Sequence, residues 1–552
     1  MIRRVDKKTG TYSDALEAVG WGSLMAELGV RNVEIQDDGT QFTLRGDGDL
    51  ELDYHAKPGF WFVADAKNQT PKVAEWFLDY EVERGKEEAQ REYEKATRKK
   101  SKTMAGKAEA GDLVVPDPPK PELRLAKLIS SMRKGWNGDR ELAHWIDQHP
   151  DGTREWIQAT AEDRSFAKAP DLSNTQLLNP ATGKGVNASK TQSRSPGSIP
   201  NILVDSFSEW MKLRGMWLSM VAYRSDDDFK FMVLEPGNIS LEGLKIIRSG
   251  LDGLNLWGGV RLDILATLRC TEILIANSDG VQGGSAISLR GCRPRSVVRG
   301  LRQAFFKSLG TAAALMNEAL LPLPEWFEVR TRQDADAYLN IIHETIGQNV
   351  RDGCLGALDE DKSDEGAVLQ QYRSWLATGD FEELMEFHHS FGALMMRKSA
   401  SGAYSRLFRT EILEELLIRT YEETHMVKEI VENEGFRSVA RAIRNTTVYA
   451  VSMKQSKREV QFGLAQKWKQ KMKGGPGEFS SALAEFVQAN NWEVVHRLRG
   501  TGHQVSTADL DQVFGLIEKH DEEKVGSLLL AYGYSRAPKV EDEPQVTEEM
   551  KG

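Results

Sequence analysis

Apolar positions recur at two different spacings near the start of the chain. Residues 13–28 place Leu16 and Val19 on one face of a helix, after a serine and an aspartate that favour a helix start. Residues 31–46 instead alternate apolar and polar side chains around a turn at Gly39, where glycine accepts a positive φ. A helix followed by a β-hairpin is therefore predicted.

The middle of the chain carries apolar runs without a polar face. Three of these runs predict strands, because short segments that are apolar on both faces suit a buried sheet. They are residues 201–207, 214–224 and 228–235, with a polar turn at 225–228 between the last two. We therefore predict a mostly antiparallel, buried sheet in this region.

Helical spacing dominates from about residue 334 to residue 536. The clearest helix start is at Ser506, which is expected to cap a helix that has Asp509 in its first turn. Leu510 and Val513 follow at helical spacing. A bundle of helices is predicted for this part of the chain.

Together these patterns predict an α+β protein, with a mixed α/β N-terminal body followed by an all-α helical bundle. The chain has 552 residues, too many for one hydrophobic core. The expected regions are an α/β region with a charged linker at 1–120, a central α/β region at 121–333, a helical bundle at 334–536, and a disordered acidic tail at 537–552.

Composition narrows the cellular setting. No apolar run reaches the roughly 18 residues of a membrane-spanning helix, and no apolar stretch follows the charged N-terminus as in a secretory signal. Three cysteines are too few and too scattered for a disulfide framework or a zinc cluster. We therefore expect a cytoplasmic protein without a membrane partner.

Positive charge is concentrated in one segment of an otherwise acidic chain. The net charge is −10, yet residues 437–473 hold ten Lys or Arg and a single acid, Glu459. Within this segment Arg437, Arg441 and Arg444 recur at helical spacing and predict one basic stripe. The apolar side chains between them predict the buried stripe of the same helix. A row of arginines of this kind suits the phosphate backbone of a nucleic acid.

A loop rich in glycine and lysine, residues 178–198, precedes the predicted sheet. It does not match the phosphate-binding loop of nucleoside triphosphatases, because Gly183-Lys184 is followed by Gly185 where a Ser or Thr would bind magnesium. Its glycines instead let the backbone approach a duplex, and its Lys, Asn and Gln side chains suit phosphates and base edges. A flexible connection is the alternative interpretation.

No catalytic set stands out in the sequence. His388 and His389 are adjacent and so point to different faces of a helix, and the acidic run 226–228 is typical of a turn. There is no H-E-x-x-H motif for a metal, and spacing nominates no Ser, His and Asp set. We therefore expect neither an enzyme nor a bound metal or cofactor.

Three segments carry a resemblance to a known family. They are DALEAVGWGSLMAELG at 14–29, LNPATGKGVNASK at 178–190 and STADLDQVFGLIEKHDEEKVGSLLLAYGYSRAP at 506–538. With this order of parts, the chain resembles the large subunit of type I CRISPR Cascade complexes of the B or A-like subtypes. Its helical C-terminal region resembles the Cascade small subunit.

The resemblance implies a function in antiviral defence without catalysis. Such subunits assemble with the guide CRISPR RNA and other Cascade subunits, and they recognise the protospacer-adjacent motif in target double-stranded DNA. They support R-loop formation, with its displaced single strand, and recruit a separate helicase–nuclease. Guide pairing reads the target sequence, while the protein reads shape, backbone and the short motif. A nuclease module of the His-Asn-His type, which some relatives carry, has no match in this chain.

The resemblance also implies roles for basic and amide side chains. Contact with DNA or guide RNA at the motif end is implied for loop residues Asn179, Lys184, Asn187 and Lys190. Contact with the displaced or target strand is implied for Arg437, Arg441, Arg444, Lys454, Lys457 and Arg458. Tyr449 and Trp468 are candidates either for base stacking or for the core.

Two other interpretations of the residues stay open. One is a nucleic-acid-processing enzyme with an unrecognised active site, and the other is a scaffold whose helical bundle binds only protein. The family also suggests that an internal start at Met385, Met395 or Met396 yields a free small subunit.

Overall fold

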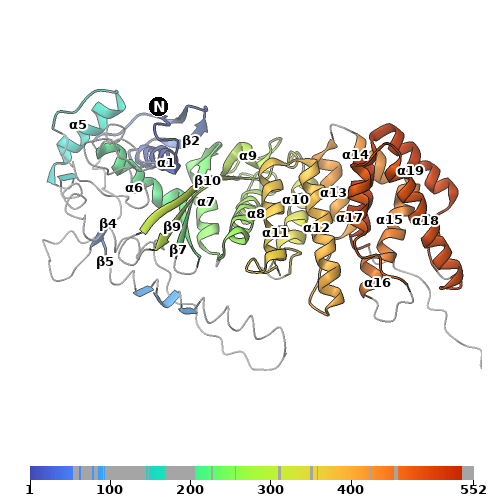
Figure 1. Ribbon diagram of the computed structural model, residues 1–552. Helices are drawn as coiled ribbons and strands as arrows, with labels where there is room; N and C mark the ends of the chain where they lie inside the picture. The colour runs from blue at the N-terminus through green and yellow to red at the C-terminus, as the bar shows by residue number, and fades with distance from the viewer. Residues whose placement is uncertain are drawn as a thin grey trace, which may run out of the picture. The chain divides into compact units, whose positions relative to one another are not determined.

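The computed structural model describes the chain outside two long stretches. It covers residues 1–53, 145–168, 206–308, 313–348, 352–452 and 458–537, apart from a few isolated positions, and short pieces between 61 and 93. The chain divides into two compact units, Met1–Leu323 and Pro324–Gly552, a little before the boundary expected at 333. The described strands lie in the first unit, and the second is helical (Figure 1). The α+β prediction is confirmed.

The first unit holds a four-stranded antiparallel sheet. Its strands, in spatial order, are β1 (Ile2–Asp6), β3 (Gln41–Asp47), β2 (Arg31–Asp37) and β8 (Asn238–Ser240). β2 and β3 form the predicted hairpin, with Gly39 at φ 88° in its turn. Because β8 pairs with β2, the expected regions 1–120 and 121–333 share one sheet.

A second antiparallel sheet includes the predicted strand 228–235. Its strands, in spatial order, are β10 (Ala313–Pro322), β9 (Val298–Ser308), β7 (Asp228–Pro236) and β6 (Met220–Ser225). Phe231 of β7 and Phe306 of β9 are buried side by side, with ring centroids 5.2 Å apart. A separate parallel pair joins β4 (Trp61–Val63) to β5 (Phe77–Asp79).

The predicted strands at 201–207 and 214–224 are wrong over much of the length that the structure describes. Ser206–Ser219 forms helix α6, and only the residues from Met220 onward are extended. Most side chains of α6 are buried, so no continuous polar face marks the helical period. A short apolar run of this kind does not distinguish a buried helix from a buried strand.

Close packing against α1 (Tyr12–Glu27), the predicted N-terminal helix, explains the burial of α6. Gly20 of α1 lies against the backbone of Met211, and Gly215 of α6 lies against the backbone of Leu16. A side chain at either glycine would collide with the other helix. Other helices that the structure describes in this unit are α5 (Pro150–Ala161), α7 (Leu241–Asp252), α8 (Val260–Ala276) and α9 (Pro294–Val297).

The second unit is a bundle of helices. They are α10 (Arg332–Ile346), α11 (Ser363–Thr378), α12 (Phe381–Ala400), α13 (Thr410–Thr420), α14 (Met426–Glu432), α15 (Glu434–Thr446), α16 (Val448–Ser452), α17 (Leu464–Met472), α18 (Glu478–His496), α19 (Thr507–His520) and α20 (Glu522–Gly533). The predicted start at Ser506 is confirmed, because its side chain accepts a hydrogen bond from the backbone N–H of Asp509 at 3.1 Å.

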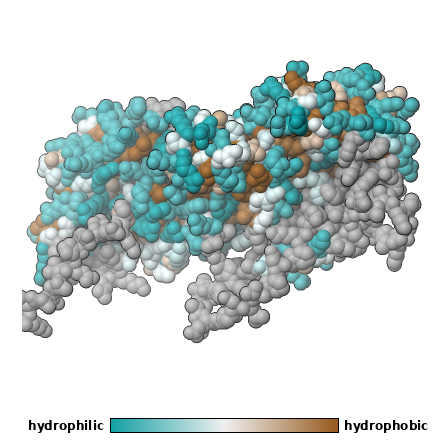
Figure 2. Space-filling model, turned by 180° about the vertical axis from the view of Figure 1, so that it is seen from behind, coloured by the Kyte–Doolittle hydropathy of each residue, from teal (hydrophilic) through white to brown (hydrophobic). Residues whose placement is uncertain are grey.

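Helix α20 lies at the centre of this bundle. The side chains from Val525 to Gly533 are all buried, and Gly533 packs directly against Ile443 of α15. The surface around the bundle core is mixed: the face in Figure 2 is mainly hydrophilic, with apolar residues scattered among polar ones. Among the described helices, none combines the length and apolar character that crossing a membrane requires.

Candidate nucleic-acid interface

The predicted loop contacts lie outside the described residues. This holds for Asn179, Lys184, Asn187 and Lys190, and also for Lys454 and Lys457. Their contact with nucleic acid stays a prediction. The structure places the four remaining residues of the predicted set, Arg437, Arg441, Arg444 and Arg458.

Three of these arginines lie on α15, whose start and burial follow from its sequence. Asn433 caps the helix by accepting a hydrogen bond from the backbone N–H of Phe436 at 3.0 Å. The predicted apolar stripe is confirmed, and its buried side chains are Phe436, Val439, Ala440 and Ile443. The helical spacing of the arginines is therefore correct, but their exposure differs.

Arg444 is buried, which corrects its assignment to a solvent-facing stripe. Its exposed fraction is 7%, and its guanidinium donates hydrogen bonds to the carbonyl oxygens of Tyr532 and Ser535, each at 2.8 Å. These carbonyls lie at the C-terminal end of α20, where the helix dipole favours a cation. Burial lowers the pKa of Arg444 from its ordinary value. This arginine joins two helices and does not face a nucleic acid.

Arg437 is half exposed but already paired. Its guanidinium donates to Glu414 Oε1 at 2.9 Å and to the carbonyl oxygen of Val431 at 2.7 Å. It lines a groove of about 640 Å³ that also contains Glu411 and Glu415. Burial raises the pKa of Glu414, and the nearby Arg437 opposes that rise. The groove is also lined by Arg419, Arg441 and Arg444, so its four arginines outnumber its three glutamates. Arg419 and Arg437 form ion pairs and Arg444 is buried, which leaves Arg441 as the exposed cation of this groove without an ion pair among the described residues.

The lysines of α17 are compensated by carboxylates from other helices. Lys469 forms an ion pair with Glu386 of α12, and Lys471 forms one with Glu478 of α18 at 2.9 Å. Lys467 lies 3.8 Å from a third carboxylate, also on α18. The segment has one acid in sequence but several in space, so much of its charge is neutralised within the bundle.

The two aromatic candidates differ in exposure. Trp468 is fully buried, and its ring meets the rings of Phe479 and Phe486 edge-on at 5.2 and 5.4 Å, so it belongs to the core. Tyr449 is half-buried, and its hydroxyl accepts a hydrogen bond from the backbone N–H of Ala537 at 3.1 Å. Trp468 is therefore unable to stack on a base, which decides between its two predicted roles.

The two other predicted arginines both influence the pKa of one histidine. Arg441 is exposed and makes no ion pair within the described part of the chain, and Arg458 donates to Asn490 Oδ1 at 3.2 Å. Burial lowers the pKa of His503, and the charges of Arg441 and Arg458 lower it further. Both cations therefore lie within electrostatic reach of one imidazole. We name Arg441, Arg458 and His503 the arginine–histidine cluster.

Amide side chains of α18 hold this cluster together. Asn490 accepts from Arg458 and donates to the carbonyl oxygen of His503 at 3.2 Å. Asn491 exchanges two hydrogen bonds with the backbone of Val505, at 2.7 and 3.0 Å. Sequence reasoning missed His503 and both asparagines. The only hint was RLRGTGH at 497–503, where glycines separate arginines from a histidine.

Ser438, His503 and Asp509 also lie together, without the arrangement of a nucleophile and its base. Ser438 Oγ donates to Asp509 Oδ2 at 2.8 Å, so its single proton is used. His503 Nε2 lies 3.0 Å from both Ser438 Oγ and the carbonyl oxygen of Ser438. Two acceptors face this nitrogen, so it carries a proton and does not accept one from the serine. The group links α15 to the start of α19.

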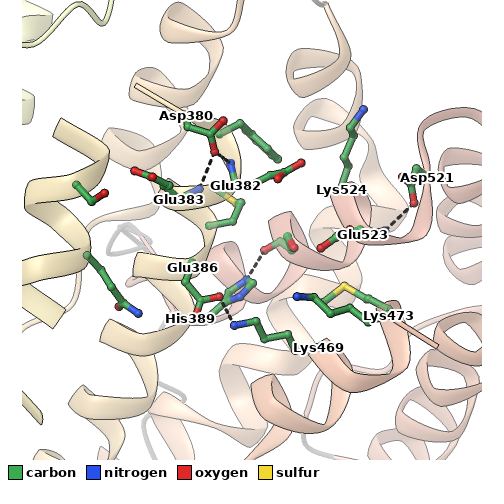
Figure 3. A pocket seen from close by; sticks show the side chains of 16 residues that line it. Asp380, Glu382, Glu383, Glu386, His389, Lys469, Lys473, Asp521, Glu523 and Lys524 are labelled. Atoms are coloured by element: carbon green, nitrogen blue, oxygen red, sulfur yellow. Dashed lines mark hydrogen bonds and ion pairs between the residues drawn. The ribbon is translucent and has the colours of Figure 1, made fainter. Parts of the chain in front are cut away.

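A cavity of about 520 Å³ lies elsewhere in the bundle, between α11, α12, α17 and α20 (Figure 3). Two helices begin at its edge. Asp380 accepts hydrogen bonds from the backbone N–H groups of Glu382 and Glu383, and Asp521 accepts one from Glu523. At both helix starts, backbone N–H groups are therefore already hydrogen-bonded to a capping aspartate.

The charges around this cavity do not favour an anion. Six carboxylates and three lysines line it, and one of the lysines, Lys469, is paired with Glu386. His389 lines the cavity with Nε2 3.1 Å from the carbonyl oxygen of Ser527. Burial lowers the pKa of His389 to about 4, so the imidazole is neutral near pH 7. Phosphate therefore suits the arginine–histidine cluster better than this cavity.

Comparison with known proteins assigns no family to this chain. No family model matches the chain, and no curated protein matches it.

Proposed function

We propose that this chain is the non-catalytic large subunit of a type I CRISPR Cascade surveillance complex, and that its arginine–histidine cluster contacts nucleic acid. The three segments that resemble the family support the proposal, as does the order of an α+β unit followed by a helical unit. The chain would recognise the protospacer-adjacent motif in duplex DNA, support R-loop formation and recruit a separate helicase–nuclease, while guide CRISPR RNA pairs with the target.

The exposed Arg441, which makes no ion pair within the described part of the chain, is the observation that carries the proposal, together with Arg458, which Asn490 links to the backbone of His503. A phosphate that approaches these side chains is attracted by the positive charge of each arginine. Two acids act on the cluster, Asp509 on His503 and Glu493 on Arg458, and each also has another partner. Asp509 accepts from Ser438 and caps α19, and Glu493 lies 3.6 Å from Arg497. Arg441 therefore offers an exposed cationic group to an external anion.

Removal of the two cluster charges tests this proposal. We expect the double variant Arg441→Gln with Arg458→Gln, in a complex assembled with guide RNA, to bind target DNA roughly tenfold more weakly at moderate salt. The slope of log affinity against log salt should fall by about 0.9 for each phosphate that the variant no longer binds. Fluorescence anisotropy with labelled target DNA across a salt series measures both quantities.

The matched control is Arg397→Gln on α12. Arg397 is exposed like Arg441 but forms an ion pair with Asp364 at 3.0 Å. Its loss should leave DNA affinity unchanged, because its charge is already compensated. Equal losses in the control and the double variant, or no loss in either, contradict the assignment of the cluster.

The motif-reading part of the proposal rests on the glycine–lysine loop. We expect Lys184→Ala with Asn187→Ala to reduce discrimination between targets with and without the correct flanking motif. If discrimination persists while overall affinity falls, the loop contacts the nucleic-acid backbone and reads no bases.

The proposal also predicts what the purified chain does not do. Alone, it should show neither nuclease nor ATPase activity, because a separate protein supplies both. Robust metal-dependent cleavage of RNA or DNA by the purified chain would instead favour a nucleic-acid-processing enzyme.

A further inference from the structure

A large aromatic ring is left in solvent on the outer face of α18. Trp492 is 55% exposed, whereas the other tryptophans whose burial the structure describes are buried or half-buried. Its ring packs on that of His496, one helical turn further on, with centroids 5.0 Å apart and planes at 41°. Exposed tryptophan is typical of surfaces that meet a partner, because its ring combines a large apolar area with few rotatable bonds.

The faces of α18 follow from the spacing of its residues. Phe486 and Val494 are buried toward the bundle, whereas Ala489 and Val495, three residues before and after Trp492, are exposed. The apolar part of the outer face is therefore small. A stable protein–protein interface commonly buries roughly 800 Å² on each partner, far more than these three side chains provide.

Two arginines follow Trp492 at the C-terminal end of the helix. His496 is exposed, and Arg497 is half exposed between Glu459 and Glu493, at 3.5 and 3.6 Å. Arg499 is exposed and forms no ion pair within the part of the chain that the structure describes. An exposed aromatic ring that is followed along the chain by an exposed arginine suits a ligand with both π-faces and phosphates.

We propose that the Trp492–His496 face of α18 binds single-stranded nucleic acid, with an unpaired base stacked on the indole and a phosphate near Arg499. Unpaired bases expose their faces, whereas those of an intact duplex are covered by neighbouring base pairs. The inference rests on the proposed function for its biological setting. It concerns a different surface from the arginine–histidine cluster, because Asn490, which holds that cluster, is buried on the other side of the helix.

The test compares Trp492→Ala with Trp492→Phe in the full-length chain. We expect Trp492→Ala to weaken binding of a fluorescent single-stranded thymidine oligonucleotide by about tenfold and to leave duplex binding nearly unchanged. Trp492→Phe should restore most of the affinity, because a smaller aromatic ring still stacks. Phe462→Ala removes another aromatic side chain, 58% exposed, and is the matched control with unchanged affinity expected.

Each other outcome overturns the stacking site. Single-strand affinity of Trp492→Ala equal to that of the control, or no restoration by Trp492→Phe, rules out stacking on the indole. Equal losses for single strand and duplex point to a general effect on folding or to a surface that binds protein. No binding of the oligonucleotide by the wild-type chain excludes the site as well. If only the cluster variant loses target affinity, the proposed function survives and the stacking site fails.

Discussion

Arg444 donates a hydrogen bond to the carbonyl oxygen of Tyr532 at 2.8 Å, joining α15 to the end of α20. The sequence pattern predicts that Arg444 contacts a nucleic acid, but its guanidinium instead forms hydrogen bonds within the protein. The stripe keeps its helical spacing, but α20 covers one end of it. Of the three arginines in the stripe, only Arg441 is exposed and makes no ion pair with a described residue.

Replacement of Arg444 should destabilise the protein. We expect Arg444→Met to lower the free energy of unfolding by about 2–4 kcal/mol, because buried carbonyl oxygens lose their donors. Arg437→Met removes a half-exposed ion pair and should cost less than about 1 kcal/mol. Urea denaturation of both variants measures the difference. Equal losses of unfolding free energy in the two variants would show that the buried hydrogen bonds of Arg444 stabilise the protein no more than the ion pair of Arg437.

The close crossing of α1 and α6 should not tolerate a methyl group. Gly20→Ala places a Cβ against the backbone of Met211, which has no flexible end that can move away. We expect a loss of about 2 kcal/mol or more and a lower melting temperature by calorimetry. Gly283→Ala is the control, because nothing lies within 4 Å of its added methyl group. A melting temperature unchanged by Gly20→Ala would mean that the two helices are not held this closely.

Two buried histidines should make stability fall in mild acid. Burial lowers the pKa of His388 to about 3 and that of His389 to about 4, from an ordinary 6.5. The unfolded chain therefore binds protons that the folded chain does not. Above pH 6.5 both histidines are neutral in the folded and the unfolded chain, so they cause no loss of stability. Between pH 6.5 and pH 4 the free energy of unfolding falls by about 1.4 kcal/mol per histidine for each pH unit.

A ring without a titrating nitrogen tests this dependence. His388→Phe keeps an aromatic group against Phe408, whose ring centroid lies 5.4 Å from that of His388. We expect the unfolding free energy of the variant to fall less between pH 7 and pH 5 than that of the wild type. Parallel curves for the two proteins would contradict the assignment of the acid sensitivity to His388.

An internal start should not yield a stable small subunit. Met385, Met395 and Met396 are themselves buried in α12, and a product beginning at Met395 lacks the buried Leu384 and Phe387 of the same helix. We therefore expect the native gene, expressed with a C-terminal tag, to give one full-length band. A second, stable band of the size expected for any of the three starts would show that the rest of the bundle folds without the residues that precede that start.

Local patterns in the sequence determined the type of many elements. Ser506 and Asp509 predicted the start of α19, and the spacing of the apolar residues in α15 predicted its buried stripe. These predictions succeed because caps and helical faces depend on residues within one or two turns of each other. The same logic placed the hairpin around Gly39.

Only the tertiary structure decided which charges remain available. Lys469 is paired with Glu386, 83 positions away, and Arg444 is covered by α20, 88 positions away at Tyr532. The burial of α6 against α1 likewise concealed its helical period. Exposure and charge compensation depend on which distant helices pack together, and the periodicity of one segment contains no information about that packing.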